Sequence, residues 1–133
     1  MKISQKQKEQ IAQIAREYYL KLILIFGSQV SKKTHRQSDL DIGIWVTKDI
    51  SFEKHLLLIS RLKEIFHINP DVTILNEADP LLLQKILENN LVLYGNPRDL
   101  AEFKMYAFFR FCDFKPYFDI EEKTVSRFIN NLQ

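Results

Sequence analysis

The chain has 133 residues, of which 46% are apolar and 27% charged, and a formal net charge of +2. We expect one domain with a single core, and the small net charge gives no electrostatic argument for direct binding of nucleic acid. The single cysteine, Cys112, excludes an internal disulfide and fits a reducing compartment. The N-terminus lacks an apolar signal region and no apolar run reaches membrane-spanning length, so the sequence predicts a soluble, cytoplasmic protein.

The first part of the chain alternates between helical and extended patterns. Residues 4–20 have the period of an amphipathic helix, with Ser4 as a candidate N-cap. The apolar run 22–26 is too short for a helix and is typical of a buried strand. A helical turn over residues 29–33 and a second strand over residues 39–47 are expected next. The buried face of the first helix is predicted to carry Ile11, Ile14, Ala15 and Tyr18.

A second helix is predicted over residues 51–67, because its apolar side chains recur with helical period. Pro70 precedes a third predicted strand over residues 71–75, and the sequence leaves open whether this strand is parallel or antiparallel to its neighbour. The side chains expected to face inward on the helix are Phe52, Leu56, Ile59, Leu62, Ile65 and Phe66.

The C-terminal part carries clear start and stop signals. Asp79 followed by Pro80 is typical of an N-cap and a first-turn proline, so we expect a helix over residues 80–89. Residues 91–94 form a short predicted strand that ends at Gly95. Two further helices are expected, one from residue 97 to about 116 and one capped by Asp119 and ending near residue 132. The alternation predicts an α/β fold in which helices pack on a small sheet.

A pair of acidic residues opens the second strand. Asp39 and Asp41 are two residues apart, so their side chains project to the same side of a strand. Two carboxylates held this close repel each other and need a cation between them. Oxygen ligands without nearby Cys or His suit Mg²⁺ better than zinc. The Gly27-Ser28 turn offers backbone N–H groups and a hydroxyl to phosphate oxygens, so the stretch indicates a site for a magnesium-bound nucleoside triphosphate.

The Gly27-Ser28 pair, a ten-residue spacer and Asp39-x-Asp41 resemble the signature of the DNA polymerase β-like nucleotidyltransferase superfamily. The short chain is similar to the minimal members, the MNT-type antitoxins that pair with HEPN-domain toxins. This resemblance implies a single nucleotidyltransferase domain over residues 1–133. Its small mixed β-sheet would form a catalytic core at about residues 20–95, and a helical extension would follow at about 97–132. Gln29 stands where such proteins often carry Arg, and the spacer contains no glycine.

The resemblance also implies roles for individual residues. Asp71 is the expected third carboxylate, which would hold a metal with Asp39 and Asp41 and help to deprotonate the acceptor. Two Mg²⁺ ions are expected at these acids, and Gly27 and Ser28 are expected to contact the phosphates. The basic spacer residues either neutralise charge on the leaving pyrophosphate or form a solvated loop, and the sequence does not choose among them: Lys32, Lys33, His35 and Arg36. Ser38 has no assigned role.

The function implied by the resemblance is transfer of AMP from ATP to a tyrosine hydroxyl of a cognate HEPN ribonuclease toxin, which neutralises the toxin. One alternative is an antitoxin that neutralises its toxin by binding alone. Another is an antibiotic nucleotidyltransferase, although such enzymes usually append a domain for the drug. Arg61 and His67 match the Arg-x₅-His spacing of the HEPN toxins, but they lie on different faces of the predicted helix, and we interpret this match as coincidence.

The segment over residues 103–118 is rich in aromatic side chains. Its apolar positions exceed what one buried face of a helix can hold, so we expect part of the segment to pack in the core and part to form a partner surface.

Overall fold

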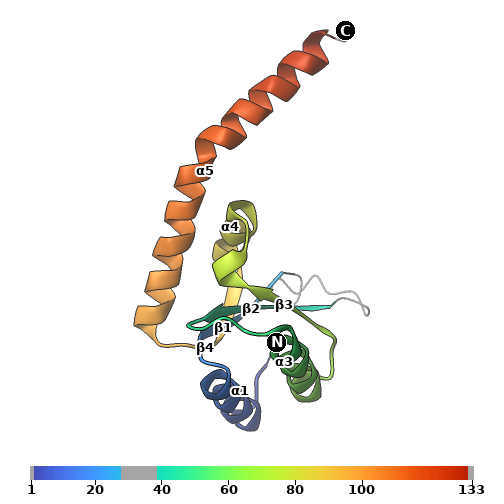
Figure 1. The fold of residues 1–133 in the computed structure, drawn as a ribbon, viewed down its shortest axis with the longest axis vertical. Coiled ribbons are helices and arrows are strands. Elements are labelled where there is room, and N and C mark those ends of the chain that lie inside the picture. The colour runs from blue at the N-terminus through green and yellow to red at the C-terminus, as the bar shows by residue number, and fades with distance from the viewer. Residues whose placement is uncertain (1, 28–38, 132–133) are drawn as a thin grey trace.

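The computed structural model describes residues 2–27 and 39–131, which form one mixed sheet with helices on both of its faces (Figure 1). The strands lie in the order β3-β2-β1-β4, with β1 antiparallel to both β2 and β4, and β2 parallel to β3. This architecture confirms the predicted fold class. The elements are α1 (Gln5–Glu17), β1 (Leu20–Phe26), β2 (Leu40–Val46), α3 (Phe52–Phe66), β3 (Pro70–Ile74), the 3-10 turn η1 (Leu75–Glu77), α4 (Pro80–Glu88), β4 (Asn90–Tyr94) and α5 (Pro97–Asn131).

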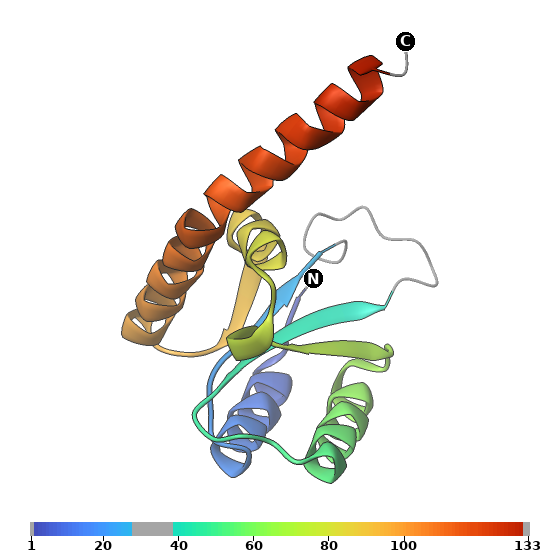
Figure 2. The same cartoon turned by 45° about the horizontal axis from the view of Figure 1, so that its top comes forward.

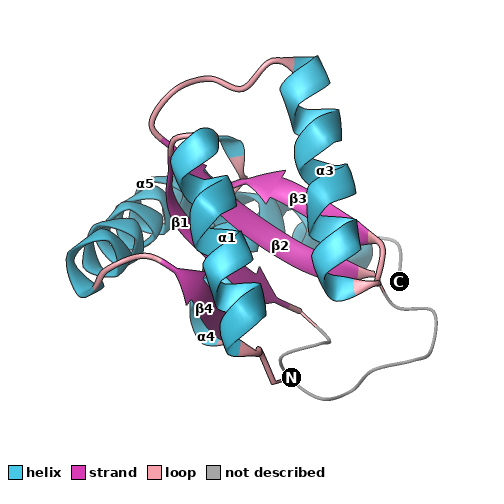
Figure 3. Ribbon diagram, turned by 90° about the horizontal axis from the view of Figure 1, so that it is seen from below, coloured by secondary structure: helices cyan, strands magenta, loops and turns pink. Residues whose placement is uncertain are grey.

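The two faces of the sheet bury separate apolar clusters. Helices α1 and α3 lie side by side on one face (Figure 3), where they pack against Ile42 and Ile44 of β2. Helix α4 and the first half of α5 cover the other face, against Leu22 and Leu24 of β1. Because side chains alternate along a strand, Asp41, which precedes Ile42, belongs to the face that α4 and α5 cover.

The predicted helix starts at Ser4 and Asp79 are confirmed. The Ser4 hydroxyl accepts a hydrogen bond from the backbone N–H of Gln7 (3.1 Å), and the Gln7 side chain accepts one from the N–H of Ser4 (3.0 Å). The Asp79 carboxylate accepts a bond from the N–H of Leu82 (2.9 Å), with Pro80 as the first helical residue. The bonds at Ser4 are reciprocal and the bond at Asp79 is single, and both caps satisfy N–H groups that have no partner inside the helix.

The predicted inward face of α3 is wrong at its N-terminal end. Phe52 is 77% exposed and Leu56 is 49% exposed, whereas Leu58 is fully buried. Leu62 and Ile65 are buried as expected. The N-terminal half of this helix has apolar residues on more than one side, so its period fits several rotations about the helix axis. Packing against the sheet selects the rotation that buries Leu58.

Helix α5 is one continuous helix rather than the two expected from the sequence. Pro116 lies inside it and Asp119 caps nothing, because the helix continues to Asn131. The missing N–H of Pro116 removes the bond to the carbonyl of Cys112, a residue that is exposed, so water can satisfy this carbonyl. The helix changes direction near its middle (Figure 2), as expected where a proline interrupts the bonding ladder.

The first half of α5 is anchored to the body of the domain through η1. Phe103 and Ala107 are fully buried, and the Tyr106 hydroxyl donates a hydrogen bond to the carbonyl of Asn76 (3.0 Å). The amide of Asn76 in turn bonds both the N–H and the carbonyl of Val46, at 2.9 and 3.0 Å. This chain of bonds ties α5 to the end of β2.

Among the described helices, none is long and apolar enough to cross a membrane.

Candidate functional site

The register between β2 and β3 brings two acidic residues together. Asp41 of β2 pairs with Asp71 of β3 in the parallel ladder. Paired residues on adjacent parallel strands point to the same face, and neighbouring strands lie about 4.8 Å apart. The two carboxylates therefore start from neighbouring positions on the face that α4 and α5 cover.

Asp39 completes an acidic group at this end of the sheet. It lies one residue before β2 and two before Asp41, and it is exposed, as is Asp71. Asp41 is half-buried, and its pKa is raised, first by burial and then by the negative charges of Asp71 and Asp39. Each cause disfavours the ionised form of Asp41, so a cation at this position would relieve both the burial penalty and the repulsion.

Gly27 allows the strand that precedes the site to turn against Asp41. Its φ is +81°, a conformation that L side chains rarely adopt, and a Cβ atom at this position would overlap the Oδ2 atom of Asp41. The residue before it, Phe26, pairs with Asp41 across the β1–β2 ladder. Only glycine therefore fits both the turn and the space beside the carboxylate.

The donor chemistry of this group fits a hard divalent cation. Three carboxylates, with no Cys or His beside them among the described residues, match the oxygen ligands that Mg²⁺ prefers. Across residues 2–27 and 39–131, however, no set of three or more His, Cys, Asp or Glu side chains already forms a group that could hold a metal ion. The ligand type fits, and closing the carboxylates around a metal would take rearrangement or the phosphate oxygens of a nucleotide.

Other residues singled out from the sequence either have structural roles or lie outside the described part of the chain. Arg61 hydrogen-bonds Glu17 and so links α3 to α1, and this bond is the main cause of a lowered pKa at Glu17. His67 is the left-handed C-cap of α3. Both residues therefore have structural roles, in line with the interpretation of their spacing as coincidence. Outside the described residues lie Ser28, Gln29, Lys32, Lys33, His35, Arg36 and Ser38.

One polar residue in the same row of the sheet was not singled out from the sequence. Asn90 pairs with Phe26, which itself pairs with Asp41, so Asn90 lies two strands from the acids. Its side-chain amide donates a hydrogen bond to the carbonyl of Ile86 at the end of α4 (2.9 Å). The only signal in the sequence was a polar residue at the start of an apolar run.

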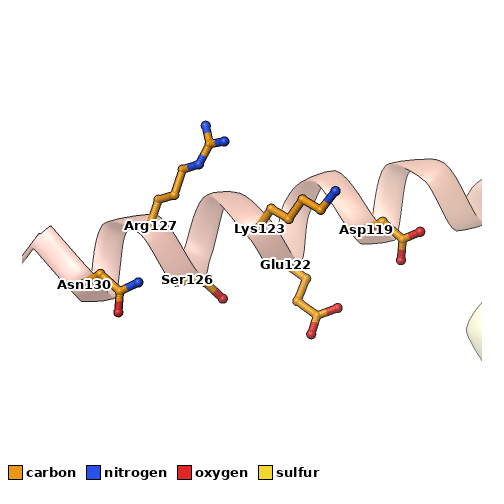
Figure 4. A pocket seen from close by; sticks show the side chains of 6 residues that line it. All are labelled: Asp119, Glu122, Lys123, Ser126, Arg127 and Asn130. Atoms are coloured by element: carbon orange, nitrogen blue, oxygen red, sulfur yellow. The ribbon is translucent and has the colours of Figure 1, made fainter.

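A separate surface pocket lies far along α5 and is distant from the acids. All of its lining side chains project from one helix, and they do not converge on a common point (Figure 4). A single helix encloses no ligand, so the acidic end of the sheet is the better candidate site. The lining residues are Asp119, Glu122, Lys123, Ser126, Arg127 and Asn130.

Solved structures share this fold over nearly the whole chain. A chain from a toxin–antitoxin crystallised with AMP-PNP has a TM-score of 0.71 at 21% identity, covering 92% of this chain and 97% of that one. A chain from tri-AMPylated Shewanella oneidensis HEPN toxin in complex with MNT antitoxin has a TM-score of 0.67 at 19% identity, covering 96% and 98%. These identities show a common fold.

A larger enzyme shares part of the fold. The spectinomycin adenyltransferase AAD(9) from Enterococcus faecialis, solved with ATP and spectinomycin, has a TM-score of 0.50 at 16% identity. The match covers 71% of this chain but 57% of that one. No curated protein matches the sequence.

A sequence model of one protein family matches most of the chain. It is described as polymerase beta, nucleotidyltransferase, and it covers residues 9–99. The matched region contains all four strands and the acidic residues Asp39, Asp41 and Asp71. Since the match spans more than half of the 133 residues, the chain belongs to the polymerase β nucleotidyltransferase family.

Proposed function

We propose that this protein is an Mg²⁺-dependent nucleotidyltransferase that moves AMP from ATP to a tyrosine hydroxyl of a HEPN ribonuclease toxin, and thereby neutralises the toxin. The observation that carries the proposal is the pairing of Asp41 with Asp71, with Asp39 beside them and a raised pKa at Asp41. A group of neighbouring carboxylates that repel one another, one of them half-buried, is costly unless cations neutralise it.

In the proposed reaction, the tyrosine oxygen attacks the α-phosphorus in line. A bond forms between this oxygen and the phosphorus, and the bond from the phosphorus to the bridging oxygen breaks, so that pyrophosphate leaves. Asp71 would take the hydroxyl proton, and Asp39 and Asp41 would hold Mg²⁺ at the position where the nucleotide binds. When bound, Mg²⁺ supplies charge neutralisation on the phosphates and lowers the pKa of the attacking hydroxyl.

Gly27 has a distinct part in this proposal. Because it lacks a side chain, its backbone can lie directly against the Asp41 carboxylate. In this proposal the backbone at Gly27 contacts a phosphate of the nucleotide. Ser28, Lys32, Lys33 and Arg36 would complete the phosphate contacts and neutralise charge on the pyrophosphate. Positioning and charge neutralisation are sufficient for this chemistry, since the protein forms no covalent bond to the substrate.

The identity of the acceptor is supported by the proteins that share the fold. One of them was solved with AMP-PNP, an ATP analogue, and another is a complex that contains a tri-AMPylated HEPN toxin.

The test is to incubate the protein with Mg²⁺, ATP and a HEPN protein, for which the product of an adjacent reading frame is the first candidate to assay. Mass spectrometry of the HEPN protein should show mass added in units of AMP, on a tyrosine. Asp39→Asn and Asp41→Asn should each abolish this addition, as should chelation of the metal. Full transfer by either variant, or none by the wild-type protein, would contradict the proposal.

A second candidate function is neutralisation by binding alone, with no transfer. The observation in its favour is the row of exposed apolar side chains on the second half of α5. The two functions separate when an Asp39→Asn/Asp41→Asn double variant is expressed with the toxin in cells. Growth that is rescued by the double variant supports binding alone, and growth that fails supports transfer.

A third candidate is transfer of AMP to a drug. We consider it because the chain shares part of its fold with the spectinomycin adenyltransferase. This chain spans little more than half of that enzyme. Incubation with ATP and spectinomycin, followed by assay for released pyrophosphate, tests this candidate, and we expect no release.

A further inference from the structure

The second half of α5 projects from the rest of the domain. Every side chain that the structure describes between residues 112 and 131 is exposed, in contrast to the buried Phe103 and Ala107 of the first half. Figures 1 and 2 show this half extending past α4 and away from the sheet. At about 1.5 Å per residue, these 20 residues form a helix about 30 Å long.

This projecting half is amphipathic. Tyr117, Val125 and Phe128 are 68%, 52% and 65% exposed. Together with Glu121 they share one face of the helix, because consecutive members of this set are three or four residues apart. We call these four residues the α5 stripe. The opposite face carries the polar side chains shown in Figure 4, among them Ser126 and Asn130. A helix that is solvated on all sides gains nothing from separating apolar and polar side chains onto opposite faces. A helix that docks on a partner buries its apolar face there.

The α5 stripe continues the buried face of the first half. Phe103 and Ala107 are followed at helical spacing by Phe114, Tyr117 and Glu121, so the face that packs on the domain becomes the face that is exposed. The stripe therefore faces the space beyond α4 rather than away from the domain.

This space lies at the acidic end of the sheet. Strand β4 begins at Asn90, in the row of Asp41, and ends at Tyr94, so α5 starts at the opposite end and runs back. In Figures 1 and 2, the C-terminal end of α5 and the starts of β2 and β3 lie toward the same side of the molecule. A protein seated on the α5 stripe would lie on the same side of the molecule as the three acids, and it would reach them by extending back past α4.

The negative charge of Glu121 indicates which kind of protein can bind to the α5 stripe. Glu121 lies at the centre of the stripe, with Tyr117 and Val125 on either side along the same face. If two copies of this chain paired through their stripes, the two Glu121 carboxylates would come together in an apolar interface, which is costly. A partner with Lys or Arg at this point would instead form a charge-assisted hydrogen bond.

We infer that the α5 stripe is the docking surface for the acceptor protein. That protein would present an apolar helical groove with one Lys or Arg opposite Glu121. The inference rests on the proposed function for the identity of the partner. The family match ends at residue 99, before the projecting half of α5. The described side chains of this half are all exposed, so they are accessible to a partner.

The experiment measures the affinity of the full-length protein for the HEPN protein of the transfer assay by isothermal titration calorimetry, and AMP transfer on the same samples. Val125→Glu and Phe128→Glu place charge in the stripe, and each should weaken binding about tenfold or more. Ser126→Glu and Asn130→Glu make a matched change on the opposite face and should leave binding unchanged. Far-ultraviolet circular dichroism checks that α5 stays helical in all four variants.

Glu121→Lys gives a second test of the occupant. It should weaken binding, and reversing the charge of one Lys or Arg on the partner should restore it. Wild-type affinity in both stripe variants would overturn the inference, as would a stripe variant that converts a self-associated wild-type protein to a monomer without loss of partner binding.

Failure of the inference and failure of the proposed function give different results. If the stripe variants bind and are still active in transfer, the docking surface is wrong and the transferase stands. If the wild-type protein binds through the stripe but transfers no AMP, the docking surface stands and the transferase is wrong.

Discussion

The polar groups at the two ends of strand β2 differ in whether they have favourable partners. At the end of the strand, the side chain of Asn76 satisfies both the N–H and the carbonyl of Val46. At its start, Asp41 is half-buried beside two other acids. Burial and the repulsion from these acids raise the pKa of Asp41. The backbone groups of Val46 are hydrogen-bonded at one end, whereas a half-buried carboxylate lies beside two like charges at the other. Polar contacts therefore stabilise the fold at one end of the sheet, and the electrostatics at the other end are unfavourable.

The largest expected effect comes from removing the charge at the start of β2. Asp41→Asn should lower AMP transfer about a thousandfold or more, because the proposed function makes Asp41 a metal ligand. The same change should leave the melting temperature unchanged or raised, since it relieves burial of a charge and repulsion from Asp71. Radiolabelled transfer assays and thermal unfolding of the metal-free protein measure the two effects. A destabilised but active variant would contradict the assignment.

A second prediction compares two glycines at positive φ. Gly27 has φ +81° and Gly95 has φ +134°, so alanine strains the backbone at both sites, by about 1–2 kcal/mol. At Gly27 the new methyl group also meets the Asp41 carboxylate, whereas at Gly95 it lies 2.6 Å from a methyl carbon of Leu22. Gly27→Ala should therefore abolish most AMP transfer, and Gly95→Ala should reduce stability while transfer by the folded fraction is retained.

At the other end of β2, removal of a polar side chain should have the opposite sign. Asn76→Ala leaves the N–H and carbonyl of Val46 without partners, which should lower the free energy of unfolding by about 2 kcal/mol. Urea denaturation measures this loss. The contrast with Asp41→Asn would fail if both variants shifted the unfolding free energy in the same direction.

The smallest expected effect is a dependence of stability on pH. The pKa of Asp41 is higher in the folded protein than in the unfolded chain, so the folded state binds more protons between the two values. The free energy of unfolding should then fall as pH rises from the ordinary range of Asp through the raised pKa. Melting temperatures of the metal-free wild type and of Asp41→Asn, between about pH 4 and pH 7, should diverge with rising pH. Parallel curves would show that Asp41 is not perturbed.

Much of the local structure was predictable because its signals act within a few residues. Ser4 and Asp79 cap their helices through bonds to residues three positions along the chain, so their roles are visible in the sequence. The rotation of α3 was not predictable, since an apolar-rich helix satisfies several rotations equally and only the sheet selects Leu58 over Phe52. The sequence predicted a helix end at Pro116, but the helix continues through it. The cost of the hydrogen bond that a proline removes depends on whether water reaches the unpaired carbonyl, and this exposure is a property of the tertiary structure.

The sequence by itself determined the chemistry available to this protein: an Asp-x-Asp pair opening a strand, a preceding Gly-Ser turn and a third acid after Pro70. It could not determine that β3 lies parallel to β2 with Asp71 beside Asp41, because strand direction and register depend on contacts between segments about 30 residues apart. Nor could it show that the apolar face of α5 leaves the core halfway along the helix. A continuous apolar pattern predicts burial, and only the tertiary structure decides where the body of the domain ends.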